Sequence, residues 1–191
     1  MKDKDEPVIL KKNSIIFADD AHGFERFFKL EHWCVKTADR EDDRIVWIRG
    51  EFVLIVAVTP EQKVVVLREY KQAAGTVLLG LPAGAKKNDE TPKAAALREL
   101  REESGYSATE DHCSVFGPFL NSPDKSTEKH YVVFVSDVVK FDSPSPDESE
   151  TILEVKLLDL ESAKREIKIG MHRMALQEVH DLLADQKTGM T

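Results

Sequence analysis

Residues Gly84 to Tyr106 read GAKKNDETPKAAALRELREESGY, and this stretch decides how the chain folds. Thr91 is a favourable N-cap, and Pro92 stands at the first helical position, where its missing N–H costs nothing. The residues that follow are nearly all strong helix formers. Gly105 suits the left-handed conformation that ends many helices. The sequence therefore predicts a helix that begins after Thr91 and ends before Gly105.

Three glutamates of this helix, Glu99, Glu102 and Glu103, have the i, i+3, i+4 spacing that places side chains on one face. Each like-charge pair at this spacing costs about 0.2–0.5 kcal/mol. A face open to water tolerates that cost, so the charges alone are explained most simply by solvation. A divalent cation would remove the repulsion, because Mg²⁺ prefers carboxylates together with water and substrate phosphates.

The full spacing of the stretch favours the cation. After Gly84 come five residues and then Glu90, and after seven more come Arg98-Glu99-Leu100, then Glu102-Glu103 and Gly105-Tyr106. A known sequence pattern requires one residue type at each of seven of these positions, and the chain has all seven. A chance match has a probability of about 10⁻⁸ per starting point. The pattern over 84–106 is that of the Nudix box, and the chain resembles a Nudix hydrolase.

Composition and charge limit the other possibilities. The 191 residues suffice for one sizeable α/β domain with an appendage. A net charge of −8 disfavours nucleic acid as a partner, and no apolar run of about 20 residues could span a membrane. The N-terminus lacks the apolar core of a signal peptide, and the two cysteines, Cys34 and Cys113, do not form a disulfide framework. We therefore expect a cytoplasmic protein.

Apolar runs outline a β-rich chain with helices. Strands are expected at 52–58, 63–70, 76–79, 113–120, 129–135 and 152–158, and helices at 160–167 and 171–183. The first two of these strands are apolar on both faces, which predicts a sheet covered on each side. The resemblance implies the same fold class: α/β, with a mixed sheet sandwiched between helices in an α/β/α arrangement. The Nudix hydrolase domain is expected to occupy 51–191.

Residues 1–50 are expected to form a separate antiparallel β module. Residues 8–10 predict an edge strand, and a polar turn at 37–43 leads to a strand at 44–48. The aromatic-rich segment 24–33 has little of its own module to pack against. Packing against a second copy of the chain would cover it, and the resemblance implies a homodimer through this module.

The resemblance also implies the metal site. A diphosphate repels nucleophiles, and divalent ions neutralise its charge and activate water. In proteins similar to this one, Glu99 and Glu103 bind Mg²⁺ or Mn²⁺, Glu102 takes part directly or through water, and the carbonyl of Ala83 completes the site. Arg98 orients the glutamates. Arg98 and Glu102 are thus counted with the catalytic residues.

Further residues suggest the substrate. Leu81-Pro82-Ala83-Gly84 and Ser122-Pro123 resemble ADP-ribose pyrophosphatases, which hydrolyse ADP-ribose or related nucleoside diphosphate sugars to a nucleoside monophosphate and a sugar phosphate. Two positions depart from that subgroup: Gly80 stands where Glu is usual, and Lys71 where Arg is usual. Lys keeps the charge but lacks the bidentate fork of Arg.

Candidate substrate-binding residues lie outside the box, and so does the expected base. The substrate-binding candidates are Trp47, Arg68, Lys71 and Pro123. Trp47 either stacks on the nucleobase or belongs to the core of the hairpin. In the subgroup the catalytic base lies on a later loop, and the acidic stretch at 147–150 provides Glu150 first and Glu148 second. A Nudix hydrolase of dinucleoside polyphosphates, nucleoside triphosphates or 5′-RNA ends, and a non-catalytic nucleotide-binding module, are the alternatives.

Overall fold

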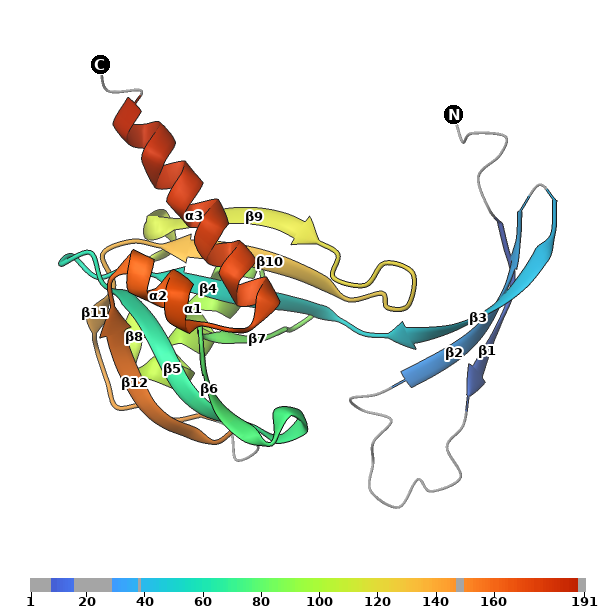
Figure 1. The fold of residues 1–191 in the computed structure, drawn as a ribbon, viewed down its shortest axis with the longest axis horizontal. Coiled ribbons are helices and arrows are strands. Elements are labelled where there is room, and N and C mark those ends of the chain that lie inside the picture. The colour runs from blue at the N-terminus through green and yellow to red at the C-terminus, as the bar shows by residue number, and fades with distance from the viewer. Residues whose placement is uncertain (1–7, 16–28, 38, 147–149, 189–191) are drawn as a thin grey trace. The chain divides into compact units, whose positions relative to one another are not determined.

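The structure is a computed structural model that describes residues 8–15, 29–37, 39–146 and 150–188 (Figure 1). Contacts divide the chain into two units: unit 1 comprises 1–51 and 119–129, and unit 2 comprises 52–118 and 130–191. Residues 119–129, which include the Ser-Pro loop, therefore group with the N-terminal residues. Phe24, Phe27, Phe28 and Glu148 lie outside the described residues.

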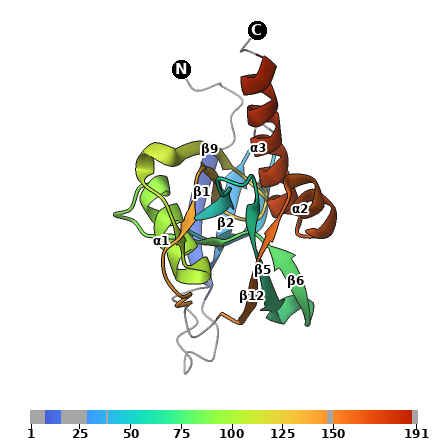
Figure 2. The same ribbon diagram turned by 90° about the vertical axis from the view of Figure 1, so that its left-hand side faces the viewer.

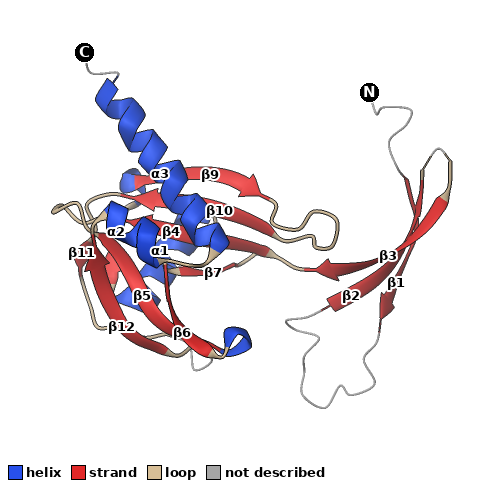
Figure 3. Ribbon diagram, in the orientation of Figure 1, coloured by secondary structure: helices blue, strands red, loops and turns tan. Residues whose placement is uncertain are grey.

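Unit 2 holds most of the helices and strands (Figure 3). Its strands are β4 (Glu51–Ala57), β5 (Val64–Lys71), β6 (Thr76–Gly80), β7 (Ala83–Lys86), β8 (Tyr106–Ser107), β9 (Cys113–Phe119), β10 (Lys129–Val135), β11 (Val139–Lys140) and β12 (Ile152–Leu158). Its helices are α1 (Pro92–Ser104), α2 (Leu160–Glu166) and α3 (Gly170–Thr188), with 3-10 turns at Gln72–Ala74 and Glu110–His112. The strand orders are β7-β4-β10-β9, β12-β5-β6 and β11-β8.

The sheets of unit 2 lie between helices. Figure 2 shows α1 on one side of the strands and α2 with α3 on the other. In β4, Val53, Ile55 and Ala57 belong to the buried cluster that includes Leu100 of α1. Leu54 and Val56 point the opposite way, since side chains alternate along a strand, and they are buried as well. The predicted sheet with two covered faces is therefore present, and so is the α/β/α arrangement.

Helix α1 begins and ends at the predicted residues. The Thr91 side chain accepts a hydrogen bond from the Ala94 N–H at 3.1 Å. At the other end, Gly105 has φ of 69°, and its N–H donates to the Arg101 carbonyl at 2.8 Å. Leu100 on the inner face is fully buried. Local capping and an apolar inner face thus fix the position of the helix that carries the glutamates.

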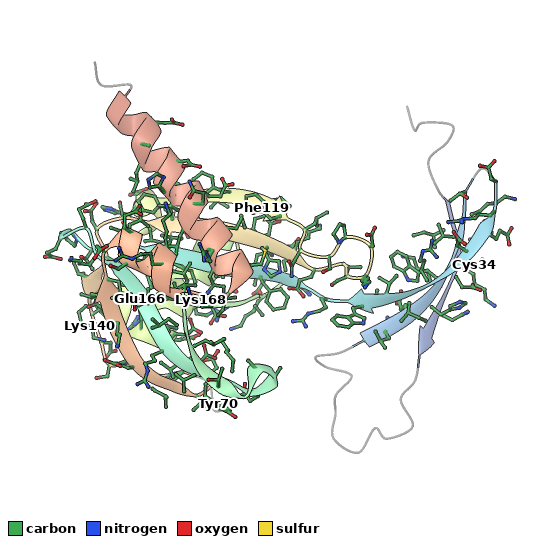
Figure 4. The ribbon with its side chains drawn as sticks, viewed as in Figure 1. Cys34, Tyr70, Phe119, Lys140, Glu166 and Lys168 are labelled. Carbon is green, nitrogen blue, oxygen red and sulfur yellow. The ribbon has the colours of Figure 1, made fainter. Side chains whose placement is uncertain are left out.

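Two features of unit 2 differ from the prediction. Strand β5 is buried only in its first half, because Arg68 and Tyr70 are exposed near its end (Tyr70 is labelled in Figure 4). Strand β7 was not expected, since the residues at the start of the Nudix box include no apolar run that would indicate a strand. It forms because the chain returns beside β4 and the Pro82 carbonyl accepts the Ile55 N–H at 2.8 Å.

Unit 1 contains the predicted antiparallel β module. Strands β1 (Val8–Ile15), β2 (Lys29–Lys36) and β3 (Glu41–Ile48) form a sheet in that order. Strand β1 is longer than the predicted 8–10, and β3 includes part of the predicted turn at 37–43, because Asp42 and Asp43 pair with β2. On one face, Ile45 and Trp47 are 50% and 46% exposed.

No helix in the described ranges has the length and apolarity needed to cross a bilayer.

Replacing Thr91 by Ala tests the start of α1. The substitution removes the acceptor for the Ala94 N–H, and N-cap losses typically lower the free energy of unfolding by about 1 kcal/mol. Urea denaturation of Thr91→Ala and Thr91→Ser provides the comparison. Ser retains the hydroxyl and should keep most of the stability, so equal losses in both variants would contradict the capping role.

Candidate active site

Two of the three helix glutamates are buried rather than solvated. Glu99 and Glu103 are only 8% and 3% exposed. The turn that begins β7 covers them: the Ala83 N–H donates to Glu103 Oε2 at 2.9 Å. A Cβ added at Gly84 would overlap the Glu99 carboxyl group. The glycine is therefore needed because the carboxylate occupies the space that a side chain would take.

Arg98 connects the glutamates to the loop before the helix. Its Nε and Nη2 donate to the two carboxylate oxygens of Glu90 at 2.7 and 3.0 Å. Its Nη1 donates to Glu99 Oε1 at 2.8 Å and to Glu102 Oε2 at 3.0 Å, and Nη2 also reaches the Ala85 carbonyl at 2.9 Å. The hydrogen bond from Arg98 lowers the pKa of Glu90 to about 2, and the same bond raises the pKa of Arg98.

When ionised, the two buried carboxylates are only partly compensated by the groups around them. Burial raises the pKa of Glu103 to about 9, although its bond from Ala83 acts in the opposite direction. Burial also raises the pKa of Glu99, and Arg98 offsets part of that shift. A buried charge with few partners is costly unless an opposite charge is nearby. Two such oxygen donors side by side fit a hard divalent cation.

Two further carboxylates act electrostatically on Glu99 and Glu103. The negative charge of Glu150 contributes to the raised pKa values of both Glu99 and Glu103, and Glu69 on β5 contributes to that of Glu103. The predicted base Glu150 therefore lies within electrostatic reach of the helix glutamates. Glu102 differs from its neighbours, since its side chain is 46% exposed.

The segment that leads towards Glu150 is bound to the C-terminal end of α1. Lys140 of β11, labelled in Figure 4, donates through Nζ to the Ser104 carbonyl at 2.7 Å. The N–H groups of Phe141 and Asp142 donate to the Gly105 carbonyl at 2.9 and 3.1 Å. The Ser145 N–H donates to the Glu102 carbonyl at 2.7 Å. These bonds hold the chain along the helix end before Glu150.

A cavity of about 540 Å³ lies along the same segment. Its lining residues are Leu97, Arg98, Arg101, Glu102, Ser107, Asp142, Ser143 and Ser145. Arg98 and Glu102 thus face both their ion-pair partners and open space.

The predicted substrate-binding residues divide between the units. In unit 2, Lys71 forms an ion pair with Glu69 at 2.6 Å, and Arg68 lies 3.7 Å from Glu154. In unit 1, the Trp47 N–H donates to the Lys125 carbonyl at 2.7 Å. Trp47 lines a cavity of about 130 Å³ together with residues of the segment 121–128. Pro123 of the same segment lines a second cavity of about 520 Å³. With 46% exposure, Trp47 is not a core residue of the hairpin.

Two residues that act on the carboxylates or on the segment before them were missed in the sequence. Glu69 lies between Arg68 and Lys71, and only the alternation of side chains along a strand could have indicated which face it occupies. His172 accepts a hydrogen bond from the Leu81 N–H at 2.8 Å, and no spacing in the sequence indicates this contact. Among the described residues, no three His, Cys, Asp or Glu side chains are already arranged around a metal position. A cation at Glu99 and Glu103 would therefore also need backbone oxygen, water or substrate phosphate.

The chain is similar to a known domain family and to several known proteins. The NUDIX domain family matches residues 49–178. The chain is 28% identical over 111 residues to the ADP-ribose pyrophosphatase of Bacillus subtilis, covering 58% of this chain and 59% of that protein. It is 27% identical over 116 residues to a methanol dehydrogenase activator of Bacillus methanolicus, covering 61% and 62%. It is 33% identical over 86 residues to the ADP-sugar pyrophosphatase of Mus musculus, covering 41% and 39%.

The matched segments thus span less than two thirds of these relatives. A solved structure described as an ADP compounds hydrolase has a TM-score of 0.80, with 21% identity over 97% of this chain and 98% of that one. This similarity confirms the predicted fold class.

The raised pKa of Glu103 predicts how the stability of the metal-free protein depends on pH. The carboxyl group has a pKa of 4.5 in its ordinary state and about 9 in the fold, so the folded state binds the proton more tightly. The resulting stabilisation is complete below about pH 4.5 and is lost as the pH rises towards 9. Glu103→Gln should remove this decline, as measured by urea denaturation in the presence of a chelator.

Glu102→Gln is the matched control, because its side chain is 46% exposed on the same helix. It should keep the wild-type pH dependence. A decline that persists in Glu103→Gln would contradict a buried, poorly compensated charge at that position.

Proposed function

This chain belongs to the NUDIX domain family, and from that premise we propose that it hydrolyses the diphosphate bond of ADP-ribose or a related nucleoside diphosphate sugar. The products are a nucleoside monophosphate and a sugar phosphate. The observation that carries the proposal is the pair of buried carboxylates, Glu99 and Glu103, packed against the turn at Ala83 and Gly84. The similarity to the ADP-ribose pyrophosphatase and the ADP-sugar pyrophosphatase supports the choice of substrate.

Mg²⁺ or Mn²⁺ is the proposed cofactor. Glu99 and Glu103 would hold it, with Glu102 and the Ala83 carbonyl completing the oxygen donors. When bound, such an ion neutralises the charge of the diphosphate and lowers the pKa of a water molecule. Arg98 keeps the oxygens of Glu99 and Glu102 turned towards each other, since one Nη1 donates to both. By holding these oxygens in place before the substrate binds, Arg98 would contribute to catalysis.

Glu150 is the proposed general base. It would accept a proton from the attacking water, so that no covalent intermediate with the protein forms. Its charge acts on both buried glutamates, which supports a position beside the reacting diphosphate. Glu148, in the same acidic stretch, is the second candidate.

The substrate, the assembly and the location complete the proposal. Arg68 and Lys71 would bind phosphate oxygens, and Trp47 with Pro123 would contact the nucleoside. The chain would act as a cytoplasmic homodimer through the module at 1–50, with the hydrolase domain at 51–191. The exposed Ile9, Leu10 and Ile45 of the β1–β3 sheet support an interface there, because a partner would remove their apolar surface from water.

A substrate panel tests the reaction. We expect turnover of ADP-ribose or another nucleoside diphosphate sugar with Mg²⁺ or Mn²⁺, and none in a chelator. Glu103→Gln should lose more than about 100-fold in kcat, since even residues that only support metal ligands contribute about 10–100-fold. The panel also holds NADH, diadenosine polyphosphates and nucleoside triphosphates, with product formation followed by chromatography.

Each alternative has its own outcome in this panel. Turnover of triphosphates alone would replace the proposed substrate class with another Nudix reaction. Tight nucleotide binding without any turnover would identify a non-catalytic module.

Two matched substitutions identify the base. Loss of a general base typically lowers kcat by about 10²–10⁴-fold, so Glu150→Gln should show a loss of this size while still binding metal. Glu148→Gln has the same change in charge and should stay within a few-fold of wild type. The reverse ranking would assign the base to Glu148.

A further inference from the structure

The segment that follows β6 and leads into the Nudix box is bound to the beginning of α3. His172, in the first turn of α3, accepts the Leu81 N–H through Nδ1 at 2.8 Å. Leu81 is only 3% exposed, so water cannot easily replace this bond. Leu81 immediately follows β6 and precedes the turn at Ala83 and Gly84. A residue of the C-terminal helix therefore holds the backbone just before the carboxylate site.

Gly80 makes room for the imidazole. A Cβ added at Gly80 would lie 3.2 Å from both Cε1 and Nδ1 of His172, and 3.5 Å from Cδ1 of Ile169. A distance of 3.2 Å is tighter than nine in ten real Cβ contacts, so the ring would have to shift by a few tenths of an ångström. Gly80 is the position at which the resemblance led us to expect Glu. In this chain the ring of His172 occupies the space beside that position, so the glycine and the histidine depend on each other.

The residues after Leu81 are held in turn. The Pro82 carbonyl accepts the Ile55 N–H of β4 at 2.8 Å. The Ala83 N–H donates to Glu103 at 2.9 Å, and Gly84 packs against the Glu99 carboxyl group. Consecutive residues are thus bound to α3, β4 and α1. A shift of Leu81 would reach Glu103 through two peptide units, at Ala83, and Glu99 through three, at Gly84.

His172 is suited to accept rather than donate. Burial lowers its pKa to about 4, and the electrostatic effects of Lys71 and His130 act in the same direction. The ring is therefore neutral near pH 7, and the bond from Leu81 assigns the proton to Nε2.

We propose that His172 is a positioning residue of the active site, which sets the turn at Ala83 and Gly84 by holding the Leu81 N–H in the space left by Gly80. The inference rests on the proposed function for its metal site. A bond that only attached α3 to the sheet would affect stability but would leave metal affinity and kcat unchanged.

Substitutions of His172 separate these two roles. His172→Asn keeps an acceptor near the position of Nδ1, whereas His172→Phe keeps a ring but leaves the Leu81 N–H unsatisfied. We expect His172→Phe to weaken Mn²⁺ binding and to lower kcat by about 10-fold each, the lower end of the range for residues that support metal ligands. His172→Asn should recover most of both, and KM should change much less than kcat.

A double-mutant cycle tests the dependence of Gly80 on His172. Gly80→Ala should displace the ring and weaken Mn²⁺ binding as His172→Phe does. In a His172→Ala background, where no ring is present, Gly80→Ala should have little further effect. Gly170→Ala is the control, since a Cβ there meets nothing within 4 Å.

Mn²⁺ binding by electron paramagnetic resonance measures the effect without any turnover. A failure of the substrate panel would therefore leave this test intact. The inference is overturned if His172→Phe lowers thermal stability but binds Mn²⁺ and turns over substrate as wild type does. It is also overturned if His172→Asn is as impaired as His172→Phe, or if the effects in the cycle are additive. Should His172→Phe fail to fold, His172→Asn and Gly80→Ala still decide the question.

Discussion

The burial of two carboxylates against a glycine turn is the constraint on which the rest of unit 2 depends. Glu99 and Glu103 lie on the inner side of α1, where desolvation raises their pKa values. The fold offers them only partial compensation: Arg98 for Glu99, and one backbone N–H for Glu103. A chain that excluded cations would gain nothing from this arrangement, because an uncompensated buried charge is destabilising. The divalent cation proposed to bind here would offset this charge.

The contacts of Arg98 explain how far apart Glu90, Glu99 and Glu102 stand along the sequence of the Nudix box. Its guanidinium group has five donors in a planar fork, and it uses them on Glu90, Glu99, Glu102 and the Ala85 carbonyl. The loop before the helix is thus fastened to the same group that aligns the helix carboxylates. A lysine could carry the charge but could not make these contacts together.

Two separate parts of the chain are brought to this helix, mainly by backbone hydrogen bonds. The turn at Ala83 arrives through β4 and through His172 of α3, and the segment at 140–145 is bound to the carbonyls at the C-terminal end of α1. Most of these bonds use main-chain groups, so the positions depend on topology more than on the identity of the side chains. The site is therefore assembled from rigid elements around α1, which is the arrangement that precise placement of reactants requires.

The sequence by itself determined α1, because caps, helix formers and i, i+3, i+4 spacing are local properties that Thr91, Gly105 and the glutamates express without help from the rest of the chain. It also determined the family and the α/β/α fold. Only the tertiary structure decided that Glu99 and Glu103 are buried while Glu102 is half exposed, since burial depends on what packs over a helix face. The positions of Glu69, Ser145 and His172 were likewise decided there. These residues reach the site through pairings between distant segments, and no local pattern specifies which segments meet.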